Sequence, residues 1–101
     1  MKIDRERVLQ KLREQREHIE KQYGLRMIGI VGSVARGEAT DMSDVDVVVD
    51  VTGDPSLFSL SRAERHLQEA IGIGLPVELV LREGMRPASR EYMERDLVPL
   101  G

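Results

Sequence analysis

The amino-acid sequence predicts a small α/β protein in which a sheet of about three strands packs on helices. Two apolar patterns alternate along the 101 residues: stripes with helical spacing, and short runs dense in β-branched residues. A chain of this length fits one domain, here residues 1–101, and leaves no room for a second.

A helix is predicted over residues 4–23, the first stretch with helical periodicity. Asp4 is a suitable N-cap, and Gly24 is suited to the position that follows the helix. The opposite face is dense with Arg, Lys and Glu and is interpreted as a solvated surface. The apolar stripe consists of Val8, Leu9, Leu12, Ile19 and Tyr23.

Three short apolar runs, at residues 27–31, 45–51 and 76–81, are predicted to be strands. The second run is almost entirely valine, which favours a buried strand. The segments between and after these runs predict a short helix over residues 33–37, a polar loop over 38–43, a helix from 57 to 71 and a final helix over 88–97 that follows Pro87.

Composition narrows the classes of function. The net charge of −3 argues against stable nucleic-acid binding, which needs clustered Lys and Arg. The absence of cysteine excludes disulfides, thiolate metal sites and a cysteine nucleophile. No signal-peptide pattern or membrane-length apolar run is present, so we expect a cytoplasmic protein without membrane contact. With only three aromatic residues the core must be aliphatic and small, which suits a homo- or hetero-oligomer.

A Gly-Ser pair, Gly32-Ser33, stands where the first predicted strand turns into a helix. Backbone N–H groups at a helix N-terminus attract phosphate, and a serine hydroxyl adds a donor. Glycine allows a phosphate to approach closely. Arg36, one turn further on, is placed to act as a charge-assisted donor, and Gly37 is expected to end the short helix in a left-handed conformation.

Two aspartates, Asp44 and Asp46, lie two residues apart at the start of the second strand. Residues with this spacing point to the same face of a strand, so their carboxylates can share a hard cation such as Mg²⁺. Asp46 lies within a run of valines, where a charge is costly unless it is paired or bound to metal. Asp50 lies further along the strand and is not expected to be a ligand.

Glu78 is the third acidic candidate, in an apolar strand. If this strand neighbours the second one, the Glu78 carboxylate can join the aspartates and bind metal or accept the proton of an attacking hydroxyl. The alternative is that Glu78 lies on an edge strand and faces water. Each element alone is common in proteins, but their joint order is far more specific.

Gly32-Ser33, ten residues and then Asp44-Val45-Asp46 resemble the signature of the nucleotidyltransferase superfamily with the DNA polymerase β-like fold. The fuller string Gly-Ser-x-Ala-Arg-Gly-Glu-Ala, followed by Ser43-Asp44-Val45-Asp46, is similar to that of the prokaryotic minimal nucleotidyltransferases. The resemblance extends from the first helix to the third strand and is loose beyond it. It implies a small mixed sheet packed on helices.

This resemblance also implies a reaction, in which AMP passes from ATP to a hydroxyl group. Asp44, Asp46 and Glu78 would be the catalytic carboxylates and would bind one or two Mg²⁺ ions. The residues implied in nucleotide binding are Gly32, Ser33, Arg36 and Ser43. Similar proteins adenylylate a tyrosine of a HEPN-class toxin, so the resemblance implies an antitoxin of a toxin–antitoxin system.

One departure from the family pattern leaves an alternative open. Glu78 stands where the family has aspartate, and the extra methylene shifts the carboxylate by about 1.5 Å. Displacements near 1 Å can cost on the order of 100-fold in rate. A weak or inactive module that neutralises its partner by binding alone is therefore the second hypothesis. A small-molecule transferase, such as one acting on aminoglycosides, ranks last, because such enzymes carry a further domain for the acceptor.

Overall fold

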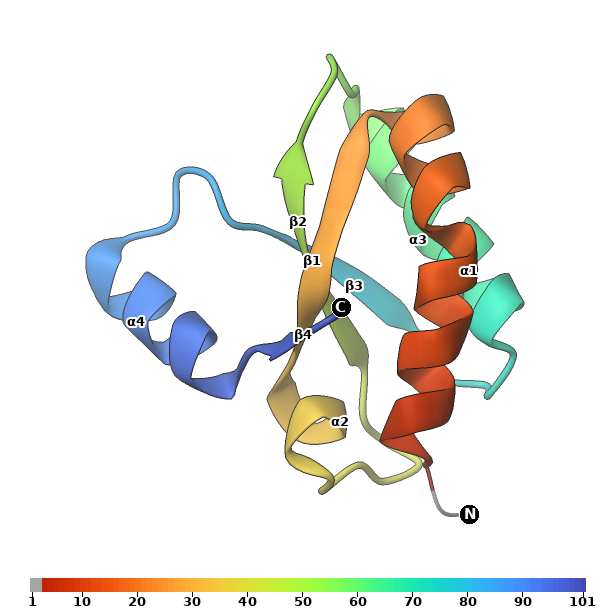
Figure 1. Cartoon of the computed structure of the whole chain (residues 1–101), viewed down its shortest axis with the longest axis vertical. Coiled ribbons are helices and arrows are strands. Elements are labelled where there is room, and N and C mark those ends of the chain that lie inside the picture. Colours follow the sequence, from red (N-terminus) through yellow and green to blue (C-terminus); the bar gives the residue numbers. More distant parts are fainter. Residues whose placement is uncertain (1–2) are drawn as a thin grey trace.

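The computed structural model describes residues 3–101, which form a mixed sheet with helices on it (Figure 1). The elements are, in chain order, α1 (Arg5–Tyr23), β1 (Leu25–Val31), α2 (Gly32–Arg36), β2 (Val45–Val51), α3 (Leu57–Ile71), β3 (Val77–Leu81), α4 (Pro87–Asp96) and β4 (Val98–Pro99). The expected α/β class is confirmed, and each expected helix and strand is present. The short strand β4 was not expected.

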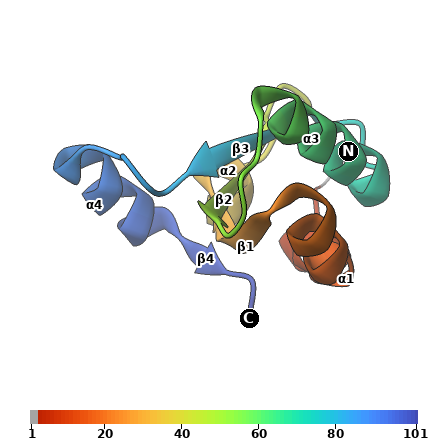
Figure 2. The same ribbon diagram turned by 90° about the horizontal axis from the view of Figure 1, so that it is seen from above.

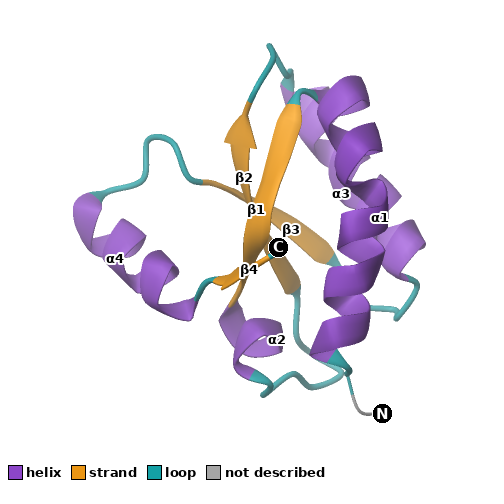
Figure 3. Ribbon diagram, in the orientation of Figure 1, coloured by secondary structure: helices purple, strands orange, loops and turns teal. Residues whose placement is uncertain are grey.

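The sheet has the strand order β3-β2-β1-β4 (Figure 3). β1 runs antiparallel to both β2 and β4, whereas β2 and β3 are parallel. The parallel pair follows from the connection, because α3 carries the chain from the end of β2 back to the start of β3. Parallel pairing places the starts of β2 and β3 side by side, and these starts carry the acidic residues.

One face of the sheet is covered by α1 and α3, and α4 lies on the other side (Figure 2). Val45, Val47 and Val49 belong to the core beneath α1 and α3. Because side chains alternate along a strand, Asp46 and Asp50 belong to the opposite face. The core residues contributed by the two helices are Val8, Leu9, Leu12, Ile19, Ala63, Leu67 and Ile71.

The helix ends largely agree with the sequence-based expectations. The Asp4 side chain accepts from the backbone N–H of Glu6 at 3.0 Å, and Gly24 ends α1 in the left-handed region at φ 67°. Leu57 is 82% exposed because it lies in the first turn of α3, immediately after the N-cap Ser56. Within residues 3–101, no helix is both long and apolar enough to span a bilayer.

Candidate active site

Three carboxylates meet at one end of the sheet. Asp44 directly precedes β2, Asp46 is the second residue of β2, and Glu78 is the second residue of β3. The parallel register pairs Asp46 with Glu78. Each of the three side chains offers an oxygen that lies within 4.8 Å of the others. The structure therefore brings together the three acidic residues that the sequence analysis selected, and we call them the carboxylate triad.

The triad is open to solvent on one side. Asp44 and Glu78 are exposed, whereas Asp46 is half-buried. β3 is an edge strand of the sheet, so Glu78 lies on an edge strand, as its alternative interpretation proposed. An exposed Glu78 on that edge nevertheless has its carboxylate beside Asp46. A ligand can thus reach the triad without displacing the core.

The electrostatics of the triad centre on Asp46. The pKa of its carboxyl is raised to about 6, first by burial and then by the negative charges of Glu78 and Asp44, while the positive charge of Arg36 acts in the opposite direction. Burial and like charge both disfavour the ionised form of an acid. A bound cation would offset both effects, and the raised pKa therefore marks this carboxyl as a functional candidate.

Gly32 allows Asp46 to occupy its position. The backbone of Gly32 has φ +82°, a conformation that side chains rarely adopt, and a Cβ atom there would lie 2.5 Å from Oδ2 of Asp46. Asp46 is also the register partner of Val31, the residue before Gly32. Gly32 was expected to allow the close approach of a phosphate, and the structure shows that it also leaves room for a carboxylate of the triad.

Two serines connect the Gly-Ser turn to the loop that precedes Asp44. The Ser33 hydroxyl donates to Oγ of Ser43 at 2.9 Å, and the same Ser43 oxygen accepts from the backbone N–H of Thr40 at 2.9 Å. Both serines are half-buried. Ser43 therefore shapes the turn that delivers Asp44 to the triad, and it holds the Ser33 hydroxyl at the start of α2.

The helix α2 ends as expected, with Gly37 in the left-handed region at φ 74°. Arg36, expected to be available to a phosphate, is engaged by two carboxylates. Its Nε donates to Glu38 at 3.1 Å, and its Nη1 donates to Asp96 at 2.7 Å. These hydrogen bonds raise the pKa of Arg36 above its ordinary value. Arg36 therefore lies beside the site with a fixed guanidinium.

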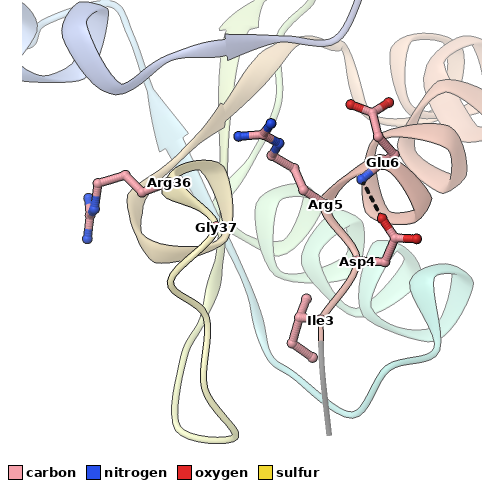
Figure 4. Close-up of a pocket in the computed structure, with 6 residues that line it drawn as sticks. All are labelled: Ile3, Asp4, Arg5, Glu6, Arg36 and Gly37. Carbon is pink, nitrogen blue, oxygen red and sulfur yellow. Dashed lines mark hydrogen bonds between the residues drawn. The ribbon is translucent and has the colours of Figure 1, made fainter.

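A shallow hollow of about 620 Å³ lies between the start of α1 and the end of α2 (Figure 4). Arg5 of α1 and Arg36 of α2 are among the residues that line it, and the carboxylate triad is not. The Arg5 guanidinium is occupied, since its Nη1 donates to the carbonyl of Ala35 at 2.6 Å. The hollow therefore adjoins α2 but is separate from the triad.

Sequence reasoning missed three residues that support this region: Arg5, Asp96 and Glu64. Glu64 of α3 accepts the backbone N–H of Leu79 at 2.9 Å, immediately after Glu78. Arg5 and Asp96 lie at helix ends and Glu64 is half-buried in the middle of α3, and no local pattern separates these three from other charged helix residues. Asp50 pairs with Arg82.

The sequence matches the family described as "Nucleotidyltransferase domain" over residues 9–98. A protein adenylyltransferase MntA of Thermococcus cleftensis is 34% identical over 83 residues, which cover 82% of each chain. A candidate protein adenylyltransferase of Methanocaldococcus jannaschii, MJ0128, is 31% identical over 88 residues, covering 86% of this chain and 88% of the relative. These relatives match most of the chain.

Solved structures agree with the fold. One, described as a candidate minimal nucleotidyltransferase, has a TM-score of 0.68 and 32% identity, covering 90% of this chain and 94% of the other. Another, described as a toxin–antitoxin with AMP-PNP, has a TM-score of 0.67 and 17% identity, covering 98% of this chain and 73% of the other, and it supports the fold alone. The chain therefore belongs to the nucleotidyltransferase domain family, as a member of its minimal nucleotidyltransferase type.

Proposed function

We propose that this protein is a Mg²⁺-dependent protein adenylyltransferase that transfers AMP from ATP to a hydroxyl group. The observation that carries the proposal is the convergence of Asp44, Asp46 and Glu78, whose oxygens lie within 4.8 Å of one another beside the Gly32-Ser33 turn. The names of the relatives, which include protein adenylyltransferase, support the same reaction class.

The carboxylate triad fits a hard divalent cation. Mg²⁺ prefers oxygen ligands and is commonly held by one or two carboxylates together with substrate phosphates. Asp44, Asp46 and Glu78 supply only oxygen donors, and the pKa of Asp46 is raised by burial and by the two neighbouring negative charges, effects that a bound cation would offset. When bound, one or two such ions would supply electrostatic stabilisation of the charge on the reacting phosphate.

The residues of this chain have separate roles in the proposed reaction. The Ser33 hydroxyl and the free donors of Arg36 orient the triphosphate. The acceptor oxygen forms a bond to the α-phosphorus, the bond from that phosphorus to the bridging oxygen breaks, and pyrophosphate leaves. The acceptor proton passes to a carboxylate, for which we propose Glu78, because it is exposed at the edge of the sheet where an acceptor can approach.

The acceptor we propose is a tyrosine of a HEPN-class toxin, which would make this protein the antitoxin of the pair. A protein acceptor is supported by the relatives named protein adenylyltransferase and by the exposure of Asp44 and Glu78, which suits an acceptor carried on a folded surface. The solved toxin–antitoxin with AMP-PNP shares this fold and motivates the choice of a toxin.

Labelling the partner with ATP tests this proposal. The protein is incubated with Mg²⁺, ATP labelled in the α-phosphate and the protein encoded beside it. We expect label on a tyrosine of that neighbour and none with the double variant Asp44→Asn, Asp46→Asn. Asp41→Asn, in the same exposed loop but outside the triad, is the matched control and should keep full labelling. Labelling that persists in the double variant would contradict the proposal.

A second candidate function is favoured by Glu78, which stands where the family has aspartate. On this hypothesis the protein neutralises its partner by binding and transfers AMP slowly or not at all. The double variant of Asp44 and Asp46 separates the two hypotheses. A binding module keeps neutralising the partner when both aspartates are replaced, whereas an adenylyltransferase loses neutralisation while it still binds.

A further inference from the structure

The ion pair between Arg36 and Asp96 joins α2 to a part of the chain outside the nucleotidyltransferase signature. Nη1 of Arg36 lies 2.7 Å from Oδ2 of Asp96, the last residue of α4. The two residues are 60 positions apart in the sequence. Glu38 holds the other edge of the same guanidinium through Nε at 3.1 Å. Arg36 is thus fixed between a carboxylate of its own loop and one from α4.

α2 needs such external contacts. It has only five residues, and a helix this short has little stability of its own. On one side, Arg5 of α1 donates to the carbonyl of Ala35 at 2.6 Å. On another side, Arg36 holds Asp96 of α4. The last turn of α2 is therefore attached to two separate helices, while its first turn carries Gly32 and Ser33.

Asp96 is itself firmly placed, because the chain after it is docked on the sheet. β4 pairs with β1 at Gly29 and Ile30, and the backbone N–H of Leu100 donates to Ile28 at 2.9 Å. The Leu100 side chain is 1% exposed. At Gly29 a Cβ atom would collide with the carbonyl of Val98, so β4 can approach only because glycine is there. This docking fixes the end of α4 relative to β1 and α2.

The guanidinium of Arg36 keeps donors available for a ligand. It carries five N–H groups, and its bonds to Glu38 and Asp96 use two of them. Within residues 3–101, Nη2 makes no hydrogen bond. Arg36 also belongs to the same five-residue helix as Gly32, at which a Cβ atom would lie 2.5 Å from Oδ2 of Asp46 in the carboxylate triad. Arg36 is therefore both immobilised and close to the site.

We propose that Asp96 is a positioning residue for nucleotide binding, which holds the Arg36 guanidinium so that its remaining donors meet the triphosphate. The inference rests on the proposed function, because ATP is the ligand concerned. It extends the site from the Gly-Ser turn and the carboxylate triad to the end of α4. Asp96 itself does not touch the nucleotide.

Equilibrium binding of AMP-PNP with Mg²⁺, measured by calorimetry, tests the inference without relying on turnover. We expect Asp96→Ala to weaken binding about three- to fivefold, the size of an exposed ion pair. Asp96→Asn keeps an oxygen that accepts from Nη1 and should stay within about twofold of the original protein. Glu91→Ala removes an exposed ion pair with Arg95 on the same helix and is the matched control, with no expected effect.

A double-mutant cycle separates positioning from general loosening of α4. In an Arg36→Ala background, Asp96→Ala should cause no further loss of AMP-PNP affinity, because its effect passes through Arg36. A further loss in that background, or unchanged affinity of Asp96→Ala alone, overturns the inference. If the original protein itself fails to bind AMP-PNP with Mg²⁺, the proposed function fails first and the inference with it. Binding by the original protein with no effect of Asp96→Ala rejects the inference alone.

Discussion

The Asp46 carboxylate occupies the space that a side chain on Gly32 would need, because a Cβ atom on Gly32 would lie 2.5 Å from Oδ2 of Asp46. The glycine of the Gly-Ser turn therefore has a steric role toward the carboxylate triad in addition to its expected role toward phosphate. Its positive φ of +82° adds backbone strain to any substitution. The Gly32-Ser33 turn and the Asp44–Asp46 pair, the two halves of the motif, are therefore adjacent in the structure.

Gly32→Ala should damage both stability and metal binding. We expect it to lower the free energy of unfolding by about 1–3 kcal/mol and to weaken Mg²⁺ binding, because Asp46 must move away from the added methyl group. Gly37→Ala is the control, since Gly37 also has a positive φ but no atom lies within 4 Å of its Cβ position. It should cost stability alone. Urea unfolding and Mg²⁺ titration check both variants, and equal Mg²⁺ affinity in the two would contradict the steric role.

The raised pKa of Asp46 predicts an unusual dependence of stability on pH. The folded protein binds a proton at this carboxyl up to a pKa of about 6, whereas the unfolded chain releases it near pH 4. The metal-free protein should therefore lose stability as the pH rises from about 4 to about 6. Asp46→Asn removes this loss, so its melting temperature should exceed that of the original protein above pH 6 and match it below pH 4.

Mg²⁺ should reverse the order of the melting temperatures of the original protein and Asp46→Asn above pH 6. Above pH 6 the added ion is expected to raise the melting temperature of the original protein, because binding to the folded state alone stabilises it. The Asp46→Asn variant should respond little. Thermal unfolding at a series of pH values, with Mg²⁺ and with a chelator, measures both effects. A melting temperature that rises with pH in the metal-free original protein would contradict a raised pKa of Asp46.

Shortening Glu78 distinguishes an adapted active site from a weakened one. Glu78 already brings an oxygen within 4.8 Å of those of Asp44 and Asp46, so the backbone of β3 accommodates the longer side chain. Glu78→Asp withdraws the carboxylate by about 1.5 Å, and we expect adenylylation to fall by about 10- to 100-fold. Glu78→Gln, which keeps the length but removes the charge, should also reduce the rate. A faster Glu78→Asp variant would instead favour the binding module.

Much of the triad could be predicted from the sequence because its geometry is local. The two-residue period of a strand brings Asp44 and Asp46 to one face, whatever the rest of the fold does. Glu78 joined them because the helix between β2 and β3 makes these strands parallel, and their starts then coincide. The prediction for Glu78 was conditional on β2 and β3 being neighbours, and the register pairs them.

The supporting contacts could not be predicted, because they join residues far apart with no periodic signal. The two-residue strand β4 contains Pro99, which argues against a strand, and it pairs only because Gly29 leaves room for it. Asp96 and Arg36 meet through the docking of that segment. Arg36 itself was expected to be open to a phosphate, and only the tertiary structure shows the two carboxylates that hold it.

Replacing Glu64 tests whether a hydrogen bond from α3 stabilises the edge strand β3 next to the triad. Its carboxylate accepts the backbone N–H of Leu79 on the edge strand β3, one residue after Glu78. Glu64→Ala leaves this partly buried N–H without a protein acceptor, so we expect the free energy of unfolding to fall by about 1–2 kcal/mol. Glu64→Gln retains an acceptor oxygen and should lose less. Glu69→Ala, an exposed change on the same helix, is the control. Urea unfolding measures all three, and if Glu64→Ala is no less stable than Glu69→Ala, the hydrogen bond does not hold β3 in place.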